Sequence, residues 1–366
     1  MVGIISIAAA VILIIVAGKQ FRQMHHDEPL FPSQFLTRTI PLSEFNKNLQ
    51  DTPGDATIYC FEGNEPGGNV LIVGGTHPNE AAGFITAYLI IENLRVQQGT
   101  VYVLPRANHS AFTHNDPQEG HPQFFTIVGK TGERRFRYGS RNTNQVDQWP
   151  DPEIYLHFPS NQKLAGNETR NLNRAYPGKI NGTLTERVAY AIVNFINTEH
   201  IDLAFDLHEA APEYPVVNAI VSAGRSQELA SEANIELQFE DLYYSIEPSP
   251  YNFHGLSHRE WADFTGTYPI LLETANPMQG RLRGKSAASL IMTGLDPMYL
   301  KAAKLGVLKV PYDNAGIPLN LRVGRHVAAI AKIVDVFSRN YPEHAIIVSG
   351  LPTHDDLITL GLGRYF

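Results

Sequence analysis

A histidine and a glutamate three positions apart are the first residues whose types and spacing suit chemistry. His77 and Glu80 follow the apolar run Val70–Val73, and Gly74-Gly75 lets the backbone turn tightly after that run. An imidazole and a carboxylate are two of the three protein ligands that a catalytic zinc commonly takes. Because sites in open α/β sheets lie beyond the carboxyl ends of strands, this turn is predicted to bind metal.

A third candidate ligand, His208, lies far along the chain. It closes the predicted strand 201–207, so it also lies at the carboxyl end of a strand. Asp206 is a candidate to orient the His208 imidazole, because metal-bound histidines commonly donate their second ring N–H to a carboxylate. We therefore predict that His77, Glu80 and His208 hold one zinc ion per chain.

Glu273 ends a further apolar strand, which begins at Tyr268. Placing a carboxylate directly after apolar positions is costly unless the carboxylate has a purpose. Beside a zinc ion, such a group takes a proton from water and passes it to a leaving amine. Glu273 is therefore predicted to be the general base.

Asn173 and Arg174 lie in the stretch Arg-Asn-Leu-Asn-Arg, which starts at Arg170 and is followed by Pro-Gly. A guanidinium matches a carboxylate with two parallel hydrogen bonds. These two residues are predicted to bind a carboxylate of the substrate.

Hydrophobic periodicity predicts the elements that position these residues. Strands are predicted at 57–61, 70–73, 101–104, 201–207, 216–221, 268–273 and 345–348, and helices at 80–94, 184–196, 227–234 and 321–337. Strands that alternate with helices indicate an α/β domain with a largely parallel or mixed central sheet.

The chain is predicted to have several segments. These are an N-terminal signal or membrane anchor at 1–18, a stalk and lead-in at 19–54, a hydrolase domain at 55–340 with an insertion at 111–165, and a C-terminal strand and tail at 341–366. The insertion is far longer than the roughly 15 residues of ordinary loops, which marks it as functional or disordered. Its aromatic content favours an ordered lid or wall beside the site.

Composition limits the classes of partner and location. Hydrophobic residues make up 43% and charged residues 18% of the 366 positions, as in a folded globular protein. The net charge of -8 makes nucleic acid an unsuitable main partner. The apolar run Val2–Gly18, followed by Lys19 and Arg22, predicts an exported or membrane-anchored protein, extracytoplasmic if bacterial.

Together, these motifs resemble the zinc carboxypeptidase superfamily, and within it the succinylglutamate desuccinylase and aspartoacylase branch. Order and rough spacing agree over residues 55–340 for His77-x-x-Glu80, the Asn173-Arg174 pair, His208 and Glu273. The resemblance implies a doubly wound, three-layer α/β domain with a mixed, mostly eight-stranded sheet, one zinc ion, and hydrolysis of an amide beside a carboxylate.

The resemblance also implies an arginine that polarises the scissile carbonyl and a tyrosine near the base. Arg141 and Arg170 both suit the arginine's place in the order, and Tyr251 is the best-placed tyrosine. Two departures from the family pattern concern the substrate. The insertion at 111–165 is longer than usual, and no separate C-terminal β-domain of the desuccinylase type is expected from these residues.

Three functions therefore stay open at this point. The motifs favour a deacylase that acts on small anionic N-acyl amino acids. The apolar N-terminus favours an exported metallocarboxypeptidase that acts on peptides. A binding protein that kept the fold but lost catalysis is the third, although it would not need to keep His77, Glu80, His208 and Glu273 together.

Overall fold

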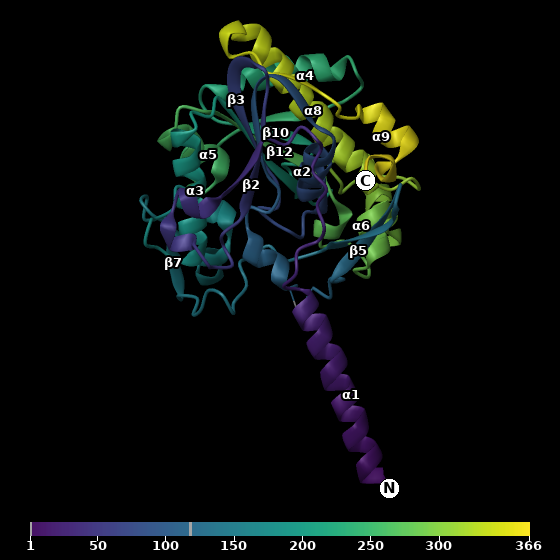
Figure 1. Ribbon diagram of the computed structural model, residues 1–366. Coiled ribbons are helices and arrows are strands. Elements are labelled where there is room, and N and C mark those ends of the chain that lie inside the picture. The colour runs from purple at the N-terminus through teal and green to yellow at the C-terminus, as the bar shows by residue number, and fades with distance from the viewer. Residues whose placement is uncertain (1, 117–118) are drawn as a thin grey trace.

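A mixed β-sheet with helices on both faces carries the candidate site (Figure 1). In the computed structural model, which describes residues 2–116 and 119–366, this sheet has nine strands. Eight of them run in the order β1-β2-β4-β3-β9-β12-β10-β11, and β13 pairs with β4. The doubly wound α/β class with a mostly eight-stranded mixed sheet is therefore confirmed.

The strands of this sheet are β1 Arg38–Pro41, β2 Thr57–Glu62, β3 Glu65–Val73, β4 Arg95–Leu104, β9 Leu203–Ala210, β10 Ala219–Ser222, β11 Ser245–Pro248, β12 Tyr268–Ala275 and β13 Ile347–Ser349. Two small hairpins are β5 Phe124–Gly129 with β6 Gly132–Arg137, and β7 Ile154–Leu156 with β8 Lys163–Ala165. The helices are α1 Val2–Gln23, α2 Ala81–Asn93, α3 Leu184–Thr198, α4 Ser226–Gln238, α5 Ser257–Phe264, α6 Ala288–Thr293, α7 Pro297–Lys304, α8 Leu319–Asn340 and α9 His354–Leu360.

The sheet is buried on both faces, and alternate residues of each central strand enter different cores. In β3, Val70 and Ile72 pack into the core that α2, α4 and α8 cover. Leu71 and Val73 point the other way, into the core that α3 and Trp261 of α5 cover. This alternation follows from the two-residue repeat of a strand, and it explains why these strands appear in the sequence as continuous apolar runs.

The chain changes direction across the sheet between β3 and β9. From β3 the chain passes through α2 to β4 on one side, whereas β9 pairs with β3 on the other side, and all these strands are parallel. Crevices beyond the carboxyl ends of strands at such a switch point are where α/β proteins bind ligands. His77 and Glu80 follow β3, and His208 lies near the end of β9.

Segments that were predicted to flank the hydrolase domain contribute to the same sheet. β1 comes from the predicted lead-in and pairs with β2, while β13 comes from the predicted C-terminal strand and tail and pairs with β4. The insertion 111–165 supplies the hairpin β5–β6, whose Phe125, Ile127 and Phe136 pack against Phe366 and the α2–α8 side of the domain. Short elements with little periodicity, such as α5, α9 and β11, were not predicted.

Helix α1 projects from the domain as a separate rod (Figure 1). It has 22 residues and none of them is buried. By length and composition it is apolar enough to cross a membrane, with a mean hydropathy of 2.5 over its most apolar 18 residues. The helix continues through Gln23, beyond the predicted limit at residue 18.

Close contact between α2 and β9 brings Glu80, which directly precedes α2, next to His208 of β9. Gly83 of α2 lies against the Leu207 carbonyl, and an added Cβ would meet that oxygen well inside contact distance. We expect Gly83→Ala to push α2 away from β9, to lower the free energy of unfolding by about 1–3 kcal/mol, and to weaken metal binding.

Denaturant unfolding and metal titration measure these two effects. Gly266→Ala is the matched control, because a Cβ at Gly266 meets no atom within 4 Å. Unchanged stability and metal affinity in Gly83→Ala would contradict the close packing of α2 on β9.

Candidate metal centre and its cavity

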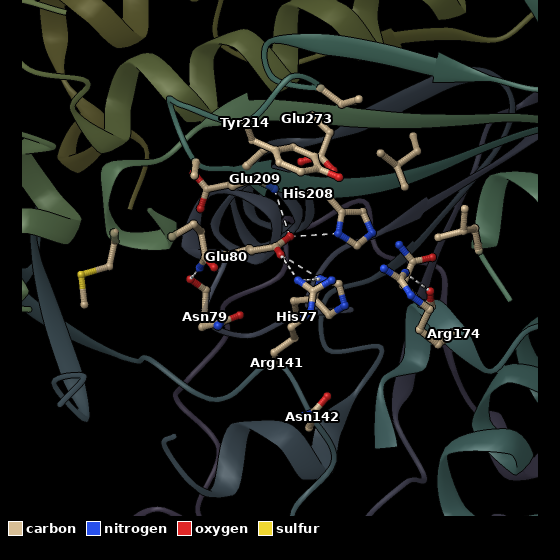
Figure 2. A pocket seen from close by; sticks show the side chains of 18 of the residues that line it. His77, Asn79, Glu80, Arg141, Asn142, Arg174, His208, Glu209, Tyr214 and Glu273 are labelled. Atoms are coloured by element: carbon tan, nitrogen blue, oxygen red, sulfur yellow. Dashed lines mark hydrogen bonds and ion pairs between the residues drawn. The ribbon is translucent and has the colours of Figure 1, made fainter. Parts of the chain in front are cut away.

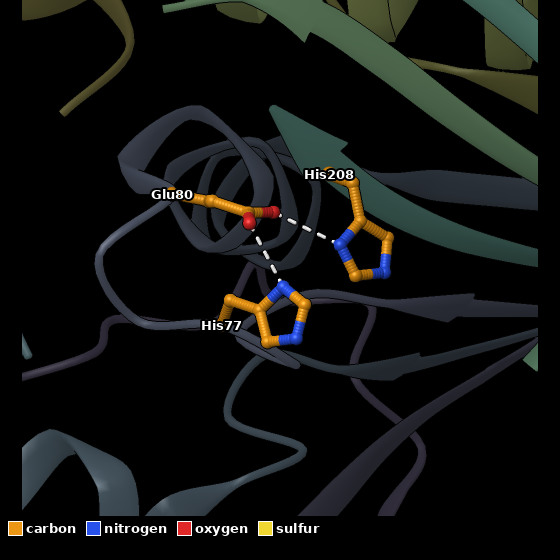
Figure 3. A group of neighbouring side chains, drawn as sticks. All are labelled: His77, Glu80 and His208. Carbon is orange, nitrogen blue, oxygen red and sulfur yellow. Dashed lines mark hydrogen bonds and ion pairs between the residues drawn. The ribbon is translucent and has the colours of Figure 1, made fainter. Parts of the chain in front are cut away.

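The three predicted ligands meet at the switch point of the sheet (Figure 3). Their ligand atoms all lie within 4.8 Å of one another, and all three residues are buried. The Glu80 carboxylate lies between the two imidazoles, with Oε1 2.8 Å from His77 Nδ1 and Oε2 2.9 Å from His208 Nδ1. Two imidazoles and one carboxylate are a ligand set that catalytic zinc sites use, with a further position left for water or substrate.

The turn that carries His77 depends on one glycine. Gly75 has a φ of +70°, and an added Cβ would meet the ring of Phe112. This backbone conformation suits glycine and strains other residues. It directs the chain from the end of β3 so that Glu80 stands directly before α2.

Each imidazole also has an oxygen partner at its second nitrogen. His77 Nε2 is 2.9 Å from Asn171 Oδ1, and the Asn171 amide nitrogen donates to Glu168 at 2.7 Å, which sets the orientation of the amide. His208 Nε2 is 2.9 Å from Asp206 Oδ2, a close contact that is poorly aligned for a hydrogen bond. Oxygen partners of this kind orient metal-binding histidines and fix their tautomer.

The protons available at His77 test whether a cation fits between these groups. Burial, and then the neighbouring Arg141, lower the pKa of His77 to about 4, so the ring is neutral and has one N–H. Burial alone would raise the pKa of Glu80, but His77 and His208 outweigh it and hold that pKa well below its usual range. His77 Nδ1 faces the Glu80 carboxylate at 2.8 Å and the Arg141 guanidinium at 3.3 Å, and Nε2 faces Asn171 Oδ1. The cationic Arg141 Nη1 thus lies beside both Nδ1 and Glu80 Oε1, where a metal ion would accept lone pairs from the same two groups.

The pKa of His208 also indicates that positive charge is favoured at this site. Burial lowers its pKa, but the carboxylates of Asp206 and Glu80 outweigh burial and raise the pKa well above the usual range. The space beside Glu80 therefore favours a positive charge, and the donor set fits zinc.

Glu273 lies on the neighbouring strand at the level of His208. β12 and β9 are parallel, and Glu273 is paired with His208 in their register. Its carboxylate lines the cavity, and Oε2 has no hydrogen-bond partner among residues 2–116 and 119–366. Burial raises the pKa of Glu273 to about 8. A carboxyl group with a pKa near neutrality beside a metal site is suited to accept and release protons.

The cavity beside these groups has a volume of about 1260 Å³. Figure 2 shows Glu273 and Tyr214 on one side of the candidate ligands and Arg141 and Asn142 on the other. The insertion forms part of the cavity wall through residues that include Asp116, Arg141 and Asp151.

The two candidate arginines differ in what they contact. Arg141 Nη1 is 3.1 Å from Glu80 Oε1, and 38% of its side chain is exposed. Arg170 is held by two hydrogen bonds to Asp151, of 2.7 and 3.0 Å, and by one to the Thr143 carbonyl of 2.8 Å. Arg141 therefore lies at the ligands with most of its donors free for a substrate, whereas the donors of Arg170 are engaged in holding the insertion.

Asn173 and Arg174 line the cavity together with the loop that precedes α5. Asn173 Oδ1 accepts from the Ser257 amide at 2.8 Å, and the Arg174 guanidinium lies 5.0 Å from the centre of the Phe253 ring. Burial, and then repulsion from Arg141, lower the pKa of Arg174 to about 10. The positive charges of Arg141 and Arg174 on the cavity lining favour an anionic ligand there.

Tyr251, which the resemblance places near the base, lies elsewhere in this structure. It is 84% exposed, its ring packs on Arg259, and it is not among the residues that line the cavity. Tyr214, from the loop between β9 and β10, lines the cavity instead. This loop lacks periodicity, so the sequence offered no signal for Tyr214.

The sequence reasoning also missed Glu209, which connects the segments that carry the site. Its backbone N–H donates to Glu80 Oε2 at 3.0 Å. Its carboxylate accepts from the Ala82 amide at 2.9 Å and from Asn276 at 3.0 Å, and it pairs with Arg322 at 2.5 Å. The side chains of Glu209 and Arg322 are fully buried, and breaking a buried pair by removing one partner is strongly destabilising.

Asn171 provides a test of the partner that orients His77. We expect Asn171→Ala to lower metal affinity about 10- to 100-fold, because the His77 ring loses the acceptor that fixes its tautomer. Metal titration by calorimetry measures the change. Asn194→Ala is the control, since Asn194 bonds to Phe45, away from the site, and equal affinities in the two variants would show that Asn171 does not orient His77.

Comparisons with known proteins found similarity only among solved structures. No protein-family model and no curated protein matches the sequence. Similar structures include a succinylglutamate desuccinylase from Silicibacter sp. TM1040, with 16% identity and a TM-score of 0.40 over 62% of this chain and 55% of that chain. A metallo-carboxypeptidase from Burkholderia cenocepacia has 11% identity and a TM-score of 0.45 over 81% of this chain and 68% of that chain.

The tripeptide-bound cell shape determinant Csd4 from Helicobacter pylori has 12% identity and a TM-score of 0.43, over 84% of this chain and 60% of that chain. The matched part of this chain covers 55% of the length of the Silicibacter succinylglutamate desuccinylase. These structures include proteins from the branches that the sequence motifs resemble.

Proposed function

We propose that this protein is a zinc-dependent amide hydrolase that acts beside a carboxylate of its substrate. The observation that carries the proposal is geometric: the ligand atoms of the buried His77, Glu80 and His208 lie within 4.8 Å of one another, and Glu273 is paired in register with His208. His77, Glu80 and His208 hold the zinc. When bound, zinc supplies Lewis acidity, which polarises a carbonyl and makes water more acidic.

The chain's own residues perform the remaining steps. Glu273 takes a proton from the attacking water and passes it to the leaving nitrogen. Arg141 donates hydrogen bonds to the carbonyl oxygen as negative charge develops on it. Asn173 and Arg174 bind the substrate carboxylate, which sets the position of the scissile amide.

The size of the cavity favours a peptide over a small N-acyl amino acid. A volume of about 1260 Å³ exceeds the roughly 300–1,000 Å³ of ordinary small-molecule sites. Arg281 and Arg283 line the cavity in addition to Arg141 and Arg174. We therefore place peptides with a free carboxylate ahead of the small acyl amino acids that the motifs favour.

We further propose that α1 anchors the protein in a membrane, with the domain outside the cytoplasm. The support is the helix itself, which is 22 residues long, has no buried residue, and has a mean hydropathy of 2.5 over its most apolar 18 residues. Such a segment suits a bilayer about 30 Å thick.

The roles of Glu273 and the ligands are separable by experiment. Glu273→Gln should keep one zinc per chain but lose about 10²–10⁴-fold in turnover of an N-acyl amino acid or peptide, as expected when a general base is removed. His77→Ala should lose the zinc as well, which elemental analysis measures. Turnover within about threefold of wild type in Glu273→Gln would exclude this glutamate as the base, and full zinc occupancy in His77→Ala would exclude the metal site.

The carboxylate pocket is tested with paired substrates. Peptides and N-acyl amino acids with a free carboxylate should be cleaved with a kcat/KM at least about 100-fold above that of their carboxamide analogues, because the amide leaves buried polar groups unpaired. Arg174→Met should reduce this preference, whereas Arg339→Met, on the exposed side of α8, should retain it. Equal rates on acids and amides would refute the pocket, and the relative rates on peptides and acyl amino acids decide between the two substrate classes.

A further inference from the structure

The end of α1 is fixed to the domain by buried contacts. The Arg137 guanidinium, only 1% exposed, donates to the carbonyl oxygens of Gln23, at 2.9 Å, and of His26. Basic side chains that bond the last carbonyls of a helix stabilise its C-terminus. Met24, the first residue beyond α1, is itself 5% exposed.

Two acidic residues continue this attachment. Asp27 and Glu28 both pair with Arg106, whose side chain is 6% exposed, and Glu28 also accepts from the Arg137 amide at 2.6 Å. Arg106 donates to the Tyr88 hydroxyl at 2.8 Å. Asp27 is 58% exposed, whereas the Arg106–Glu28 pair is buried, and removing one partner from a buried ion pair typically costs about 3–5 kcal/mol. This cluster is here called the α1 clamp.

The α1 clamp lies at the same edge of the sheet as the candidate site. Arg106 follows the end of β4, and His77 follows the end of β3, and these two strands are parallel neighbours. Arg137 precedes Arg141 of the cavity wall by four residues. In Figure 1, α1 leaves the domain on this side.

A loop that exposes two apolar side chains is joined to the clamp. Val146 is 79% and Trp149 is 70% exposed. The loop is held by Asp147, which accepts from the Ser110 hydroxyl at 2.5 Å, and the adjacent His109 contacts Asp27 of the clamp at 3.0 Å. Tryptophan is enriched at the interface between a membrane and water, so its exposure here matches a lipid surface.

The length of α1 places this edge close to the bilayer. Its apolar part, Val2–Gly18, measures about 26 Å at 1.5 Å per residue, near the lower limit for crossing a hydrocarbon core about 30 Å thick. The clamp begins directly after the last turn of α1, which contains Arg22. The linkage is therefore too short for the domain to stand away from the headgroups.

We propose that the α1 clamp holds the catalytic edge of the sheet against the bilayer that α1 enters, with Val146 and Trp149 in contact with the lipid headgroups. The proposal rests on the anchoring role of α1 given above. The cavity then opens near the membrane surface, and the substrates it reaches are those presented within a short distance of that surface.

Tryptophan fluorescence tests the contact directly. The chain has two tryptophans, of which Trp261 is fully buried and Trp149 is exposed. Full-length protein is reconstituted in phosphatidylcholine vesicles that contain lipids brominated near the headgroup end of the acyl chain. We expect quenching roughly twofold stronger in wild type than in Trp149→Phe, because tryptophan side chains favour the interface. Equal quenching in both proteins overturns the proposal.

A linker insertion tests the clamp without removing any of its residues. About ten Gly and Ser residues between Arg22 and Gln23 would span roughly 17 Å as a flexible coil and leave the contacts of Gln23, His26, Asp27 and Glu28 in place. Quenching of Trp149 should fall to the Trp149→Phe background while hydrolysis of a soluble substrate is unchanged. Unchanged quenching shows that the clamp does not orient the domain and overturns the proposal.

Failure of the anchor itself is recognised separately. An alkaline wash that releases the full-length protein from vesicles, or a mature protein whose mass lacks residues 2–18, overturns both the anchoring and the orientation. Protein that stays in the vesicles without quenching of Trp149 overturns the orientation alone.

Discussion

Much of the structure serves to stabilise the buried negative charge of the Glu80 carboxylate. A charged group in a dry interior is costly unless donors or cations surround it. Here the surroundings are two imidazoles, the Glu209 amide and Arg141. Arg141 brings positive charge to this carboxylate, and the carboxylates of Asp206 and Glu80 raise the pKa of His208 well above its usual range. Two imidazoles beside a carboxylate in such surroundings make a candidate metal site.

The elements around Glu80 are held by a second buried charge. Glu209 is the residue after His208, and its carboxylate reaches the start of α2, the segment after β12, and Arg322 of α8. One side chain thus joins the segments that supply Glu80, His208 and Glu273. Because the backbone of the same residue donates to Glu80, the packing of the second layer and the geometry of the ligands are coupled.

The parallel centre of the sheet has a consequence for the whole molecule. Parallel strands end at one edge, so the loops after β3, β4, β9 and β12 share it. The metal centre uses the loops after β3 and β9, and the α1 clamp uses Arg106 in the loop after β4. The end of α1 and the candidate site therefore lie on the same side of the domain, and the insertion forms part of the cavity wall.

The sequence by itself determined the layers of the fold and the three candidate ligands. Apolar runs and helical periodicity mark β3, β9, β12, α2 and α8, since these elements bury faces whose repeat is visible in the chain. His77 and Glu80 share one turn, and His208 and Glu273 each lie at the end of a strand, so their types and positions are local signals.

Only the tertiary structure decided which residues surround those ligands. Asn171 meets His77 across 94 positions of chain, and Tyr214 lines the cavity from a loop without periodicity. Arg141 and Arg170 are equivalent in the sequence, and their different roles follow from Asp151, which engages only Arg170. Such contacts join segments whose separation along the chain carries no periodic signal, and packing of the whole domain sets the distances between them.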